Sequence, residues 1–213
     1  MLLYAITNRH LLPGSESNHA ALVQLAVQWA ERNIDYLQIR EKDLAPDDLR
    51  YLTEQIVSTV REKNQSTKIL LNGPAEIALA SGADGVHLPA IAPPAAAAET
   101  RRLFAQSGRE AILSHACHSI EEVLKVREES QQNPHATTAN TLILYAPVFE
   151  KLTPEGKLPG QGLEALRAAV QAASNIPVFA LGGVTKENVP ACLAAGAAGI
   201  AGIRLFLESD WLR

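Results

Sequence analysis

Eight short apolar segments recur along this 213-residue chain, and a longer amphipathic stretch follows each of the first seven. The segments cover residues 2–7, 35–40, 68–72, 85–89, 111–116, 141–147, 177–182 and 199–204. Between them, apolar residues at three- and four-residue spacing predict helices over 19–33, 46–63, 74–82, 94–107, 119–129, 163–174 and 185–196. The eight segments are largely apolar on both faces, as in a parallel sheet covered by helices. This alternation predicts an α/β fold, and eight strands predict a small (β/α)8 TIM barrel.

We expect a single TIM-barrel domain over residues 1–213, because no linker is visible; an open doubly wound sheet is the structural alternative. A weak internal repeat supports the barrel. Residues 81–88 resemble residues 195–203, since in both a helix ends in glycine and a short glycine-spaced strand follows. The polar residues 129–140 are expected to form a surface loop, and residues 207–213 leave the eighth helix nearly absent.

Composition narrows the possible functions. Hydrophobic residues make up 47% of the chain and the net charge is −4, which indicates a globular protein and argues against a general nucleic-acid binder. No apolar run approaches the ~20 residues of a membrane span. Cys117 and Cys192 match no zinc or redox spacing and are expected to be small buried hydrophobes. We therefore expect a cytoplasmic protein, and a homodimer as the commonest soluble assembly.

The carboxyl ends of the strands are where a TIM barrel carries its site. The residues expected there are Gln38, Arg40, Lys42, Asn72, His87, Ser114, His115, His118, Lys151, Lys157, Gly182, Gly183, Gly202, Ile203 and Arg204. Residues 37–43, LQIREKD, raise the question of why Gln38, Arg40 and Lys42 share one face of an extended segment. A polar outer face and a charged pocket for an anion both explain it.

Gly182 and Gly183 lead into an expected helix, so free backbone N–H groups and the helix dipole favour a phosphate there. Barrels often bind phosphate with the loops after strands seven and eight, where Ile203 and Arg204 also lie. Arg204 adds a forked donor suited to phosphate. The alternative is that the two glycines only make a tight turn.

His115 and His118 lie near the end of one expected strand, and histidine titrates near neutrality. His118 precedes a capping box made by Ser119 and Glu122, which places it at the mouth of the barrel. His115 is equally open to a structural role. His87 is expected to be a structural histidine lining the barrel. Cys117 lacks an oxyanion-hole signal that would mark a nucleophile, and no Asp, His or Cys cluster suggests a metal site.

Six motifs cover nearly the whole chain in order: LQIREKD, ILLNG, SGADGVHLP, CHSIEEV, APVF and IPVFALGGVTKENV. Together they resemble the thiamine-phosphate synthase and TenI (thiazole tautomerase) superfamily. The resemblance implies a (β/α)8 fold and an enzyme that handles the thiazole phosphate half of thiamine. It also implies that Gln38, Arg40 and Lys42 line the pocket that holds the pyrimidine pyrophosphate in the synthase.

The departures from the synthase pattern concern its metal. Two acidic residues that hold Mg²⁺ in the synthase are replaced, because Asn72 is followed by Gly73 and Leu88 by PAIAP. The lysine loop after strand six is altered to FEKLTPEGK, with Lys151 and Lys157 as candidate substitutes, and Ala116 stands where a serine is usual.

The resemblance therefore leans towards a metal-independent, TenI-like tautomerase without a cofactor, which moves a proton around a carboxythiazole phosphate. His118 would be its acid/base. Gly182, Gly183, Ile203 and Arg204 would bind the phosphate. Gln38, Arg40, Lys42, Asn72 and Lys157 would bind the rest of the substrate. The alternatives are a Mg²⁺-dependent synthase with unusual metal ligands and a non-catalytic thiazole-phosphate-binding protein.

Overall fold

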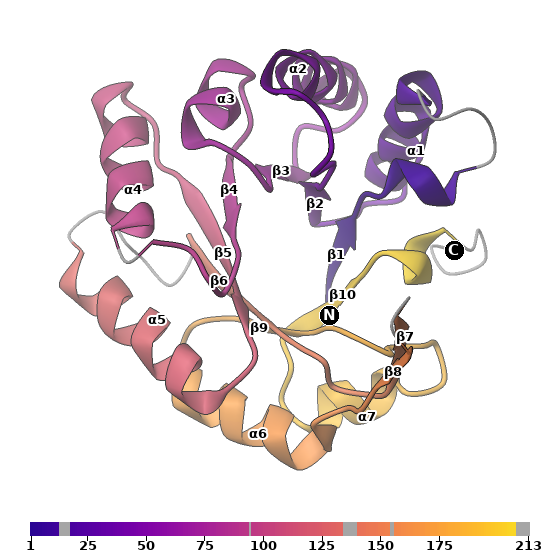
Figure 1. Cartoon of the computed structure of the whole chain (residues 1–213), viewed down its shortest axis with the longest axis vertical. Helices are drawn as coiled ribbons and strands as arrows, with labels where there is room; N and C mark the ends of the chain where they lie inside the picture. Colours follow the sequence, from indigo (N-terminus) through magenta and orange to yellow (C-terminus); the bar gives the residue numbers. More distant parts are fainter. Residues whose placement is uncertain (13–17, 94, 134–139, 154–155, 208–213) are drawn as a thin grey trace.

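Eight parallel strands close into a barrel in the order β1-β10-β9-β6-β5-β4-β3-β2, and the seven helices of the described residues surround it (Figure 1). The structure is a computed structural model that describes residues 1–12, 18–93, 95–133, 140–153 and 156–207. The barrel strands are β1 (Leu2–Ile6), β2 (Tyr36–Ile39), β3 (Lys68–Leu71), β4 (Gly85–Leu88), β5 (Ile112–Cys117), β6 (Thr141–Tyr145), β9 (Val178–Ala180) and β10 (Gly199–Gly202). The predicted TIM barrel is confirmed, and the alternative of an open sheet is wrong because β1 pairs with both β2 and β10.

The helices follow the predicted order; α2 has the predicted ends, and the other six differ from the prediction at one or both ends. They are α1 (His19–Glu31), α2 (Pro46–Lys63), α3 (Ala75–Ala80), α4 (Ala96–Gln106), α5 (Ile120–Gln132), α6 (Gly162–Ala173) and α7 (Val189–Ala194). α5 continues three residues past the expected start of the polar loop, and residues 134–139 of that loop lie outside the described residues. The short end of the chain was expected to lack a helix; its residues 208–213 also lie outside them. No helix in the described ranges is long and apolar enough to cross a membrane.

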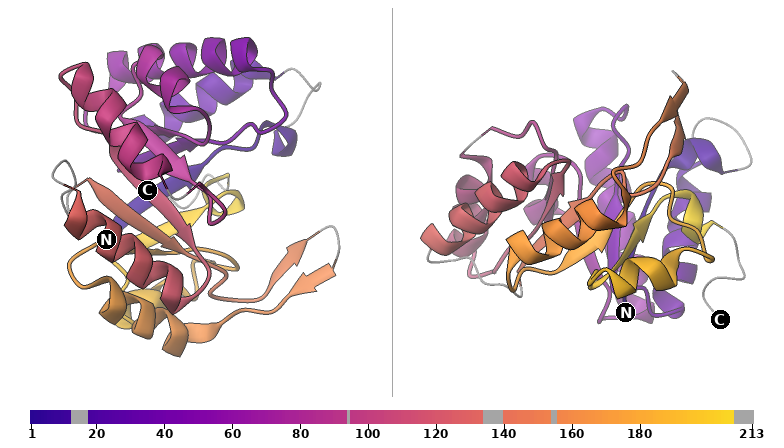
Figure 2. Two further views of the ribbon diagram at one scale, coloured as in Figure 1. Left: turned by 60° about the vertical axis from the view of Figure 1, so that its left-hand side comes forward. Right: turned by 90° about the horizontal axis from the view of Figure 1, so that it is seen from below.

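Three short elements were not predicted. A hairpin of β7 (Lys151–Thr153) and β8 (Gly156–Leu158) follows β6 and projects from the barrel (Figure 2). Two 3-10 turns, η1 (Arg9–Leu11) and η2 (Arg204–Phe206), follow β1 and β10. All three lie in the connections that follow the carboxyl ends of barrel strands, where they shape the mouth.

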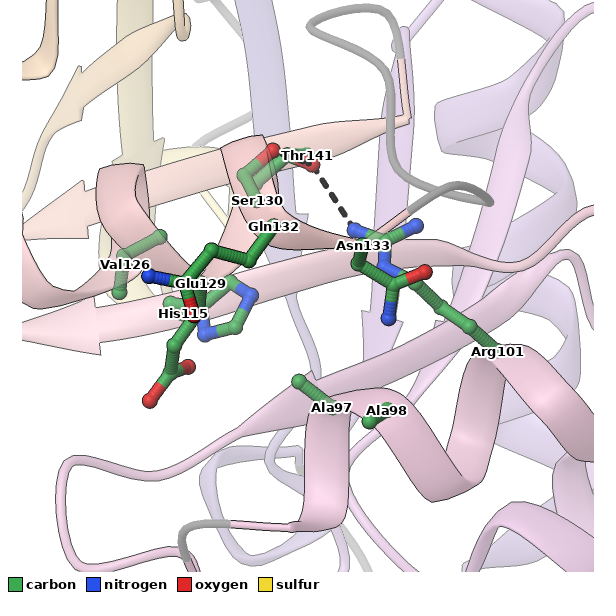
Figure 3. Close-up of a pocket in the computed structure, with 10 residues that line it drawn as sticks. All are labelled: Ala97, Ala98, Arg101, His115, Val126, Glu129, Ser130, Gln132, Asn133 and Thr141. Carbon is green, nitrogen blue, oxygen red and sulfur yellow. Dashed lines mark hydrogen bonds between the residues drawn. The ribbon is translucent and has the colours of Figure 1, made fainter.

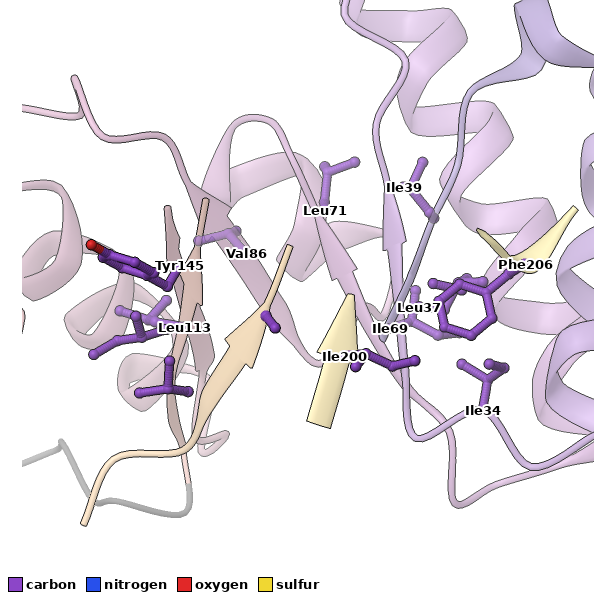
Figure 4. Packing of buried hydrophobic residues seen from close by; sticks show 14 of the residues in the cluster. Ile34, Leu37, Ile39, Ile69, Leu71, Val86, Leu113, Tyr145, Ile200 and Phe206 are labelled. Atoms are coloured by element: carbon purple, nitrogen blue, oxygen red, sulfur yellow. The ribbon is translucent and has the colours of Figure 1, made fainter. Parts of the chain in front are cut away.

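Side chains alternate between two apolar cores along the strands. The outer core lies between strands and helices and includes Leu37, Ile39, Ile69, Leu71, Val86 and Leu113 (Figure 4). The inner core fills the barrel with Tyr4, Ile6, Leu70, Leu142, Leu144, Phe179 and Ala201. On β2, the period of two turns Leu37 and Ile39 outward and Gln38 into the barrel. Gln38 is only 1% exposed, but it still lines the cavity at the mouth.

The internal repeat has a physical cause in close backbone approach. Gly85 starts β4, and a Cβ there would lie 1.8 Å from Ile112 O. Gly199 starts β10, and a Cβ there would lie 2.1 Å from Leu2 O. The glycines that end the preceding helices, Gly82 and Gly196, both have positive φ. These four positions explain why the two sequence segments look alike.

Candidate active site

A cavity of about 460 Å³ opens at the carboxyl ends of the barrel strands. Its wall combines the ends of β2, β4 and β5 with the loops that follow β6, β9 and β10. The sequence-predicted residues that line it together are Gln38, Arg40, His118, Gly182, Gly183, Ile203 and Arg204. His87, Ala116 and Lys151 line it as well. The structure therefore brings most of the candidate site residues to one cavity.

Three predicted residues do not line this cavity. Lys42 is exposed beyond the end of β2, although its charge and that of Arg40 both act on His87. Asn72 is half-buried and donates its backbone N–H to Ile39 O at 2.8 Å. Lys157 sits on β8 of the projecting hairpin, 68% exposed, with its Nζ 2.8 Å from Glu150. Lys151, at the base of that hairpin, is the lysine that reaches the cavity.

Glu41, which sequence reasoning missed, is a buried carboxylate that anchors the loop after β2. Its side chain is 1% exposed and accepts hydrogen bonds from Thr7 Oγ1 at 2.6 Å and Arg9 Nη1 at 3.0 Å. Arg9 also pairs with Asp43, and that guanidinium holds the pKa of the Asp43 carboxyl well below its usual range. Thr7 Oγ1 in turn accepts the backbone N–H of Arg40 at 2.9 Å. Arg40 is therefore held at the mouth by a buried ionic network.

His118 lies one residue beyond β5, exposed at the mouth. Its Nδ1 is 2.7 Å from Ala146 O, and because a carbonyl only accepts, Nδ1 carries a hydrogen. In the neutral ring, Nε2 is then the proton acceptor. Ser119 caps α5 as predicted, accepting the N–H of Glu122 at 3.2 Å. The Glu122 carboxylate bonds the N–H of His118 instead of that of Ser119, so it fixes the backbone of the histidine.

His115 faces the opposite way, away from the barrel interior. It lines a separate pocket of about 230 Å³ with residues of α4 and α5, where Arg101 donates to Thr141 Oγ1 at 2.8 Å (Figure 3). Burial lowers the pKa of His115 to about 4, so the ring is neutral at physiological pH. The period of two along β5 separates the two histidines, because Ser114 and Ala116 point inward with His118 while His115 and Cys117 point outward.

The two cysteines are buried free thiols, as predicted. Burial raises the pKa of Cys117 to about 12, which leaves it a thiol at neutral pH. A nucleophilic role for Cys117 therefore has no support in the site.

Backbone N–H groups form the candidate phosphate site. Among the described residues, Gly182, Gly183 and Ile203 make no hydrogen bond through their N–H groups to another residue. α7 begins at Val189 and not at residue 185, so the expected contribution of its dipole is wrong. Asn188 holds the intervening loop instead, by accepting from Thr185 N at 2.8 Å and donating to Gly183 O at 2.9 Å. Arg204 opens η2 beside this loop and lines the cavity.

Carboxylates are scarce in the cavity. Glu150 is the one acidic residue among its described lining residues, and it pairs with Lys157. In the described ranges, no group of three or more His, Cys, Asp or Glu side chains is arranged to hold a metal ion. Mg²⁺ prefers one or two carboxylates together with substrate phosphates. These residues do not fit a Mg²⁺ site, and we derive no chemical step through a metal.

Fold and cavity define the class of protein: a TIM barrel with its cavity at the carboxyl ends of the strands and glycine-rich loops after β9 and β10. The family model described as "Thiamine monophosphate synthase" matches residues 3–206. The chain belongs to this family of thiamine biosynthesis.

Curated relatives agree with this assignment, and a solved structure shares the fold. The chain is 31% identical over 207 residues to "Putative thiamine-phosphate synthase 2" of Aquifex aeolicus, covering 97% of each. It is 36% identical over 204 residues to "Putative thiamine-phosphate synthase" of Geobacter sulfurreducens, covering 93% of this chain and 83% of that one. The structure of thiamine phosphate pyrophosphorylase from Pyrococcus furiosus superposes with a TM-score of 0.74 at 24% identity, covering 99% of this chain and 90% of the other. This last likeness shows the fold alone.

Proposed function

We propose that the chain is an enzyme that binds thiazole phosphate at the mouth of the barrel and joins it to hydroxymethylpyrimidine pyrophosphate, releasing pyrophosphate. The names of its relatives favour this synthase reaction over the tautomerase suggested by the missing acids. One geometric observation carries the proposal. The cavity offers anion-binding groups at two places, the N–H groups after β9 and β10 and the cation Arg40 after β2.

Two anion sites suit two phosphorylated substrates held side by side. Thiazole phosphate would bind to Gly182, Gly183, Ile203 and Arg204, which all line the cavity. Among the described residues, the N–H groups of the first three have no acceptor and are free to bond an anion. The pyrophosphate would lie towards Arg40 and Lys151, with Lys42 nearby. Arginine and lysine can neutralise the charge that develops on a leaving pyrophosphate. Holding both substrates in one cavity lowers the entropic cost of their meeting.

The second candidate is the metal-independent tautomerase, and the scarcity of carboxylates favours it. Its step removes a proton from one position of a carboxythiazole phosphate and returns one to another. His118 has its Nδ1–H committed to Ala146 O, so Nε2 is the atom that would take up the proton. General acid–base catalysis of this kind contributes roughly 10²–10⁴-fold.

One set of assays separates the candidates. Purified protein receives hydroxymethylpyrimidine pyrophosphate plus thiazole phosphate, with Mg²⁺ or with a chelator, and separately carboxythiazole phosphate alone. Formation of thiamine phosphate supports the synthase. If thiamine phosphate still forms in the presence of the chelator, cationic side chains such as Arg40 and Lys151 take the place of Mg²⁺. Turnover of carboxythiazole phosphate alone supports the tautomerase. Tight binding of thiazole phosphate without either reaction would contradict both and leave a binding protein.

Under the tautomerase reading, His118→Asn is expected to lower the rate by roughly 10²–10⁴-fold, because the proton acceptor is lost. Thiazole phosphate should still bind, since its phosphate lies with the loops after β9 and β10. His115→Asn is the matched control, because His115 lies outside the cavity in the pocket between α4 and α5. A larger loss at His115 than at His118 would mean that the wrong histidine had been chosen.

A further inference from the structure

Four polar side chains form a continuous hydrogen-bonded chain across the inside of the barrel. Tyr4 OH donates to Gln38 Oε1 at 3.1 Å and lies 2.7 Å from Ser114 Oγ, which lies 2.8 Å from Nδ1 of His87. The four residues come from four different strands and are buried in an otherwise apolar interior. Gln38 and His87, at the two ends of the chain, both line the cavity.

The direction of each bond in this chain follows from the side-chain amide of Gln38, whose oxygen, an acceptor only, faces the Tyr4 hydroxyl. A hydroxyl donates one hydrogen, and that of Tyr4 is given to Gln38. Ser114 must therefore donate across the contact with Tyr4, which uses its only hydrogen. The remaining contact, between Ser114 Oγ and His87 Nδ1, must then be donated by the imidazole. His87 consequently carries its hydrogen on Nδ1.

The other ring nitrogen of His87 is left for the cavity. Burial, with smaller contributions from the charges of His115, Arg40 and Lys42, lowers the pKa of His87 to about 3, so the ring is neutral at pH 7. A neutral imidazole with Nδ1–H has a bare Nε2. Among the described residues, none forms a hydrogen bond with Nε2 of His87. This nitrogen is not fully buried, and His87 lines the cavity.

We propose that the Gln38–Tyr4–Ser114–His87 chain holds His87 in its Nδ1–H form and presents bare Nε2 to the cavity, where it selects ligands that offer an N–H or O–H donor. A ring with a pKa near 3 takes up protons poorly at pH 7, so His87 accepts a hydrogen bond and does not act as the base. This differs from the merely structural role expected from the sequence. The ligand part of the inference rests on the proposed function, while the protonation of His87 does not.

Nitrogen-15 NMR of histidine-labelled protein at pH 7 tests the tautomer directly. His87→Gln assigns the signals, and the wild-type spectrum is expected to show a protonated Nδ1 and a bare Nε2. In Tyr4→Phe the Ser114 hydroxyl loses its acceptor and can turn towards His87 Nδ1, so the Nε2–H form should appear. The aromatic contacts of residue 4 with Tyr36 and Phe179 suit phenylalanine equally well. A wild-type spectrum with the hydrogen on Nε2 would overturn the inference, whether or not Tyr4→Phe folds.

Thiamine phosphate and inorganic phosphate test the ligand part in the same samples. Thiamine phosphate is expected to move the His87 Nε2 signal towards the hydrogen-bonded range, whereas inorganic phosphate should leave it in place. If calorimetry shows that thiamine phosphate binds while the Nε2 signal stays unchanged, the selecting role of His87 is refuted. If thiamine phosphate does not bind at all, the proposed function fails, and the spectrum of the free protein still decides the tautomer.

Discussion

Arg204 is exposed at the start of η2 and lines the cavity beside Ile203. A guanidinium at this position either forms a hydrogen bond with the phosphate or crowds it. Removing it would weaken phosphate binding in the first case and strengthen it in the second. If it bonds the phosphate, Arg204→Ser should weaken thiazole phosphate binding by about 1.5–3 kcal/mol, the usual worth of a charged hydrogen bond. Isothermal titration calorimetry measures this. Unchanged or tighter binding would contradict direct contact.

Gly183 is required by both its backbone angle and its surroundings. Its φ is +64°, and a Cβ there would come within 2.5 Å of Glu150 O. Gly183→Ala should therefore displace the loop and weaken thiazole phosphate binding at least about tenfold, or ~1.4 kcal/mol. Gly108 is the matched control, because its φ is +68° but a Cβ would meet nothing within 4 Å. Gly108→Ala should cost only the backbone strain of about 1–2 kcal/mol in stability and leave binding unchanged. Equal effects of both variants on binding would contradict the role of the loop.

Sequence reasoning places Gly182 and Gly183 at the mouth of the barrel. The period of two that assigns Gln38 to the barrel interior also separates His115 from His118, so the sequence carries the signal for the orientation of these two histidines. The hydrogen-bonded chain ending at His87 could not be predicted. It joins four strands across the barrel, and no spacing within one segment indicates such contacts.

At the scale of elements, the loop after β2 depends on the buried Glu41. Glu41→Ala should lower the free energy of unfolding by about 1–3 kcal/mol, because the hydroxyl of Thr7 and the backbone N–H of Arg9 would lose their buried acceptor while the Arg9 guanidinium keeps Asp43. It should also weaken binding of hydroxymethylpyrimidine pyrophosphate, since Thr7 and Arg40 are held by the same network. Urea unfolding and calorimetry measure the two effects.

Glu54→Ala is the control for that variant. Glu54 forms an exposed i,i+4 pair with Arg50 on α2, where such pairs contribute about 0.3–0.5 kcal/mol. A loss of stability in Glu41→Ala no larger than this would show that the buried network does not support the loop.

The order of elements followed from hydrophobic periodicity, while the connections after the strands did not. Strand and helix patterns repeat along the chain, and eight such units favour a barrel, while the pairing of β1 with both β2 and β10 decides its closure. The β7–β8 hairpin and the late start of α7 were not predicted, because each depends on local contacts, such as those of Asn188 with the loop before α7. Lys157 was misplaced for the same reason, since the hairpin carries it away from the cavity.

At the scale of the whole molecule, two buried neutral histidines make the free energy of unfolding depend on pH. His87 on β4 faces the inside of the barrel, and His115 on β5 faces the outside. The pKa of His87 is lowered to about 3 and that of His115 to about 4, in both cases chiefly by burial. In the unfolded chain both rings titrate near 6.5. As the pH falls below 6.5, the unfolded chain binds protons that the folded protein does not, so acid favours unfolding.

Each histidine is therefore expected to lower the free energy of unfolding by up to about 1.4 kcal/mol per pH unit between pH 6 and pH 5, until the pH approaches its folded pKa. Urea denaturation at pH 7, 6 and 5 gives the slope. His87→Gln and His115→Gln should each reduce the slope, and the double variant should reduce it most. The two effects are coupled, because the charge of His115 is one cause of the lowered pKa of His87. If the slope of the double variant equals that of the wild type, neither buried ring is the source of the acid sensitivity.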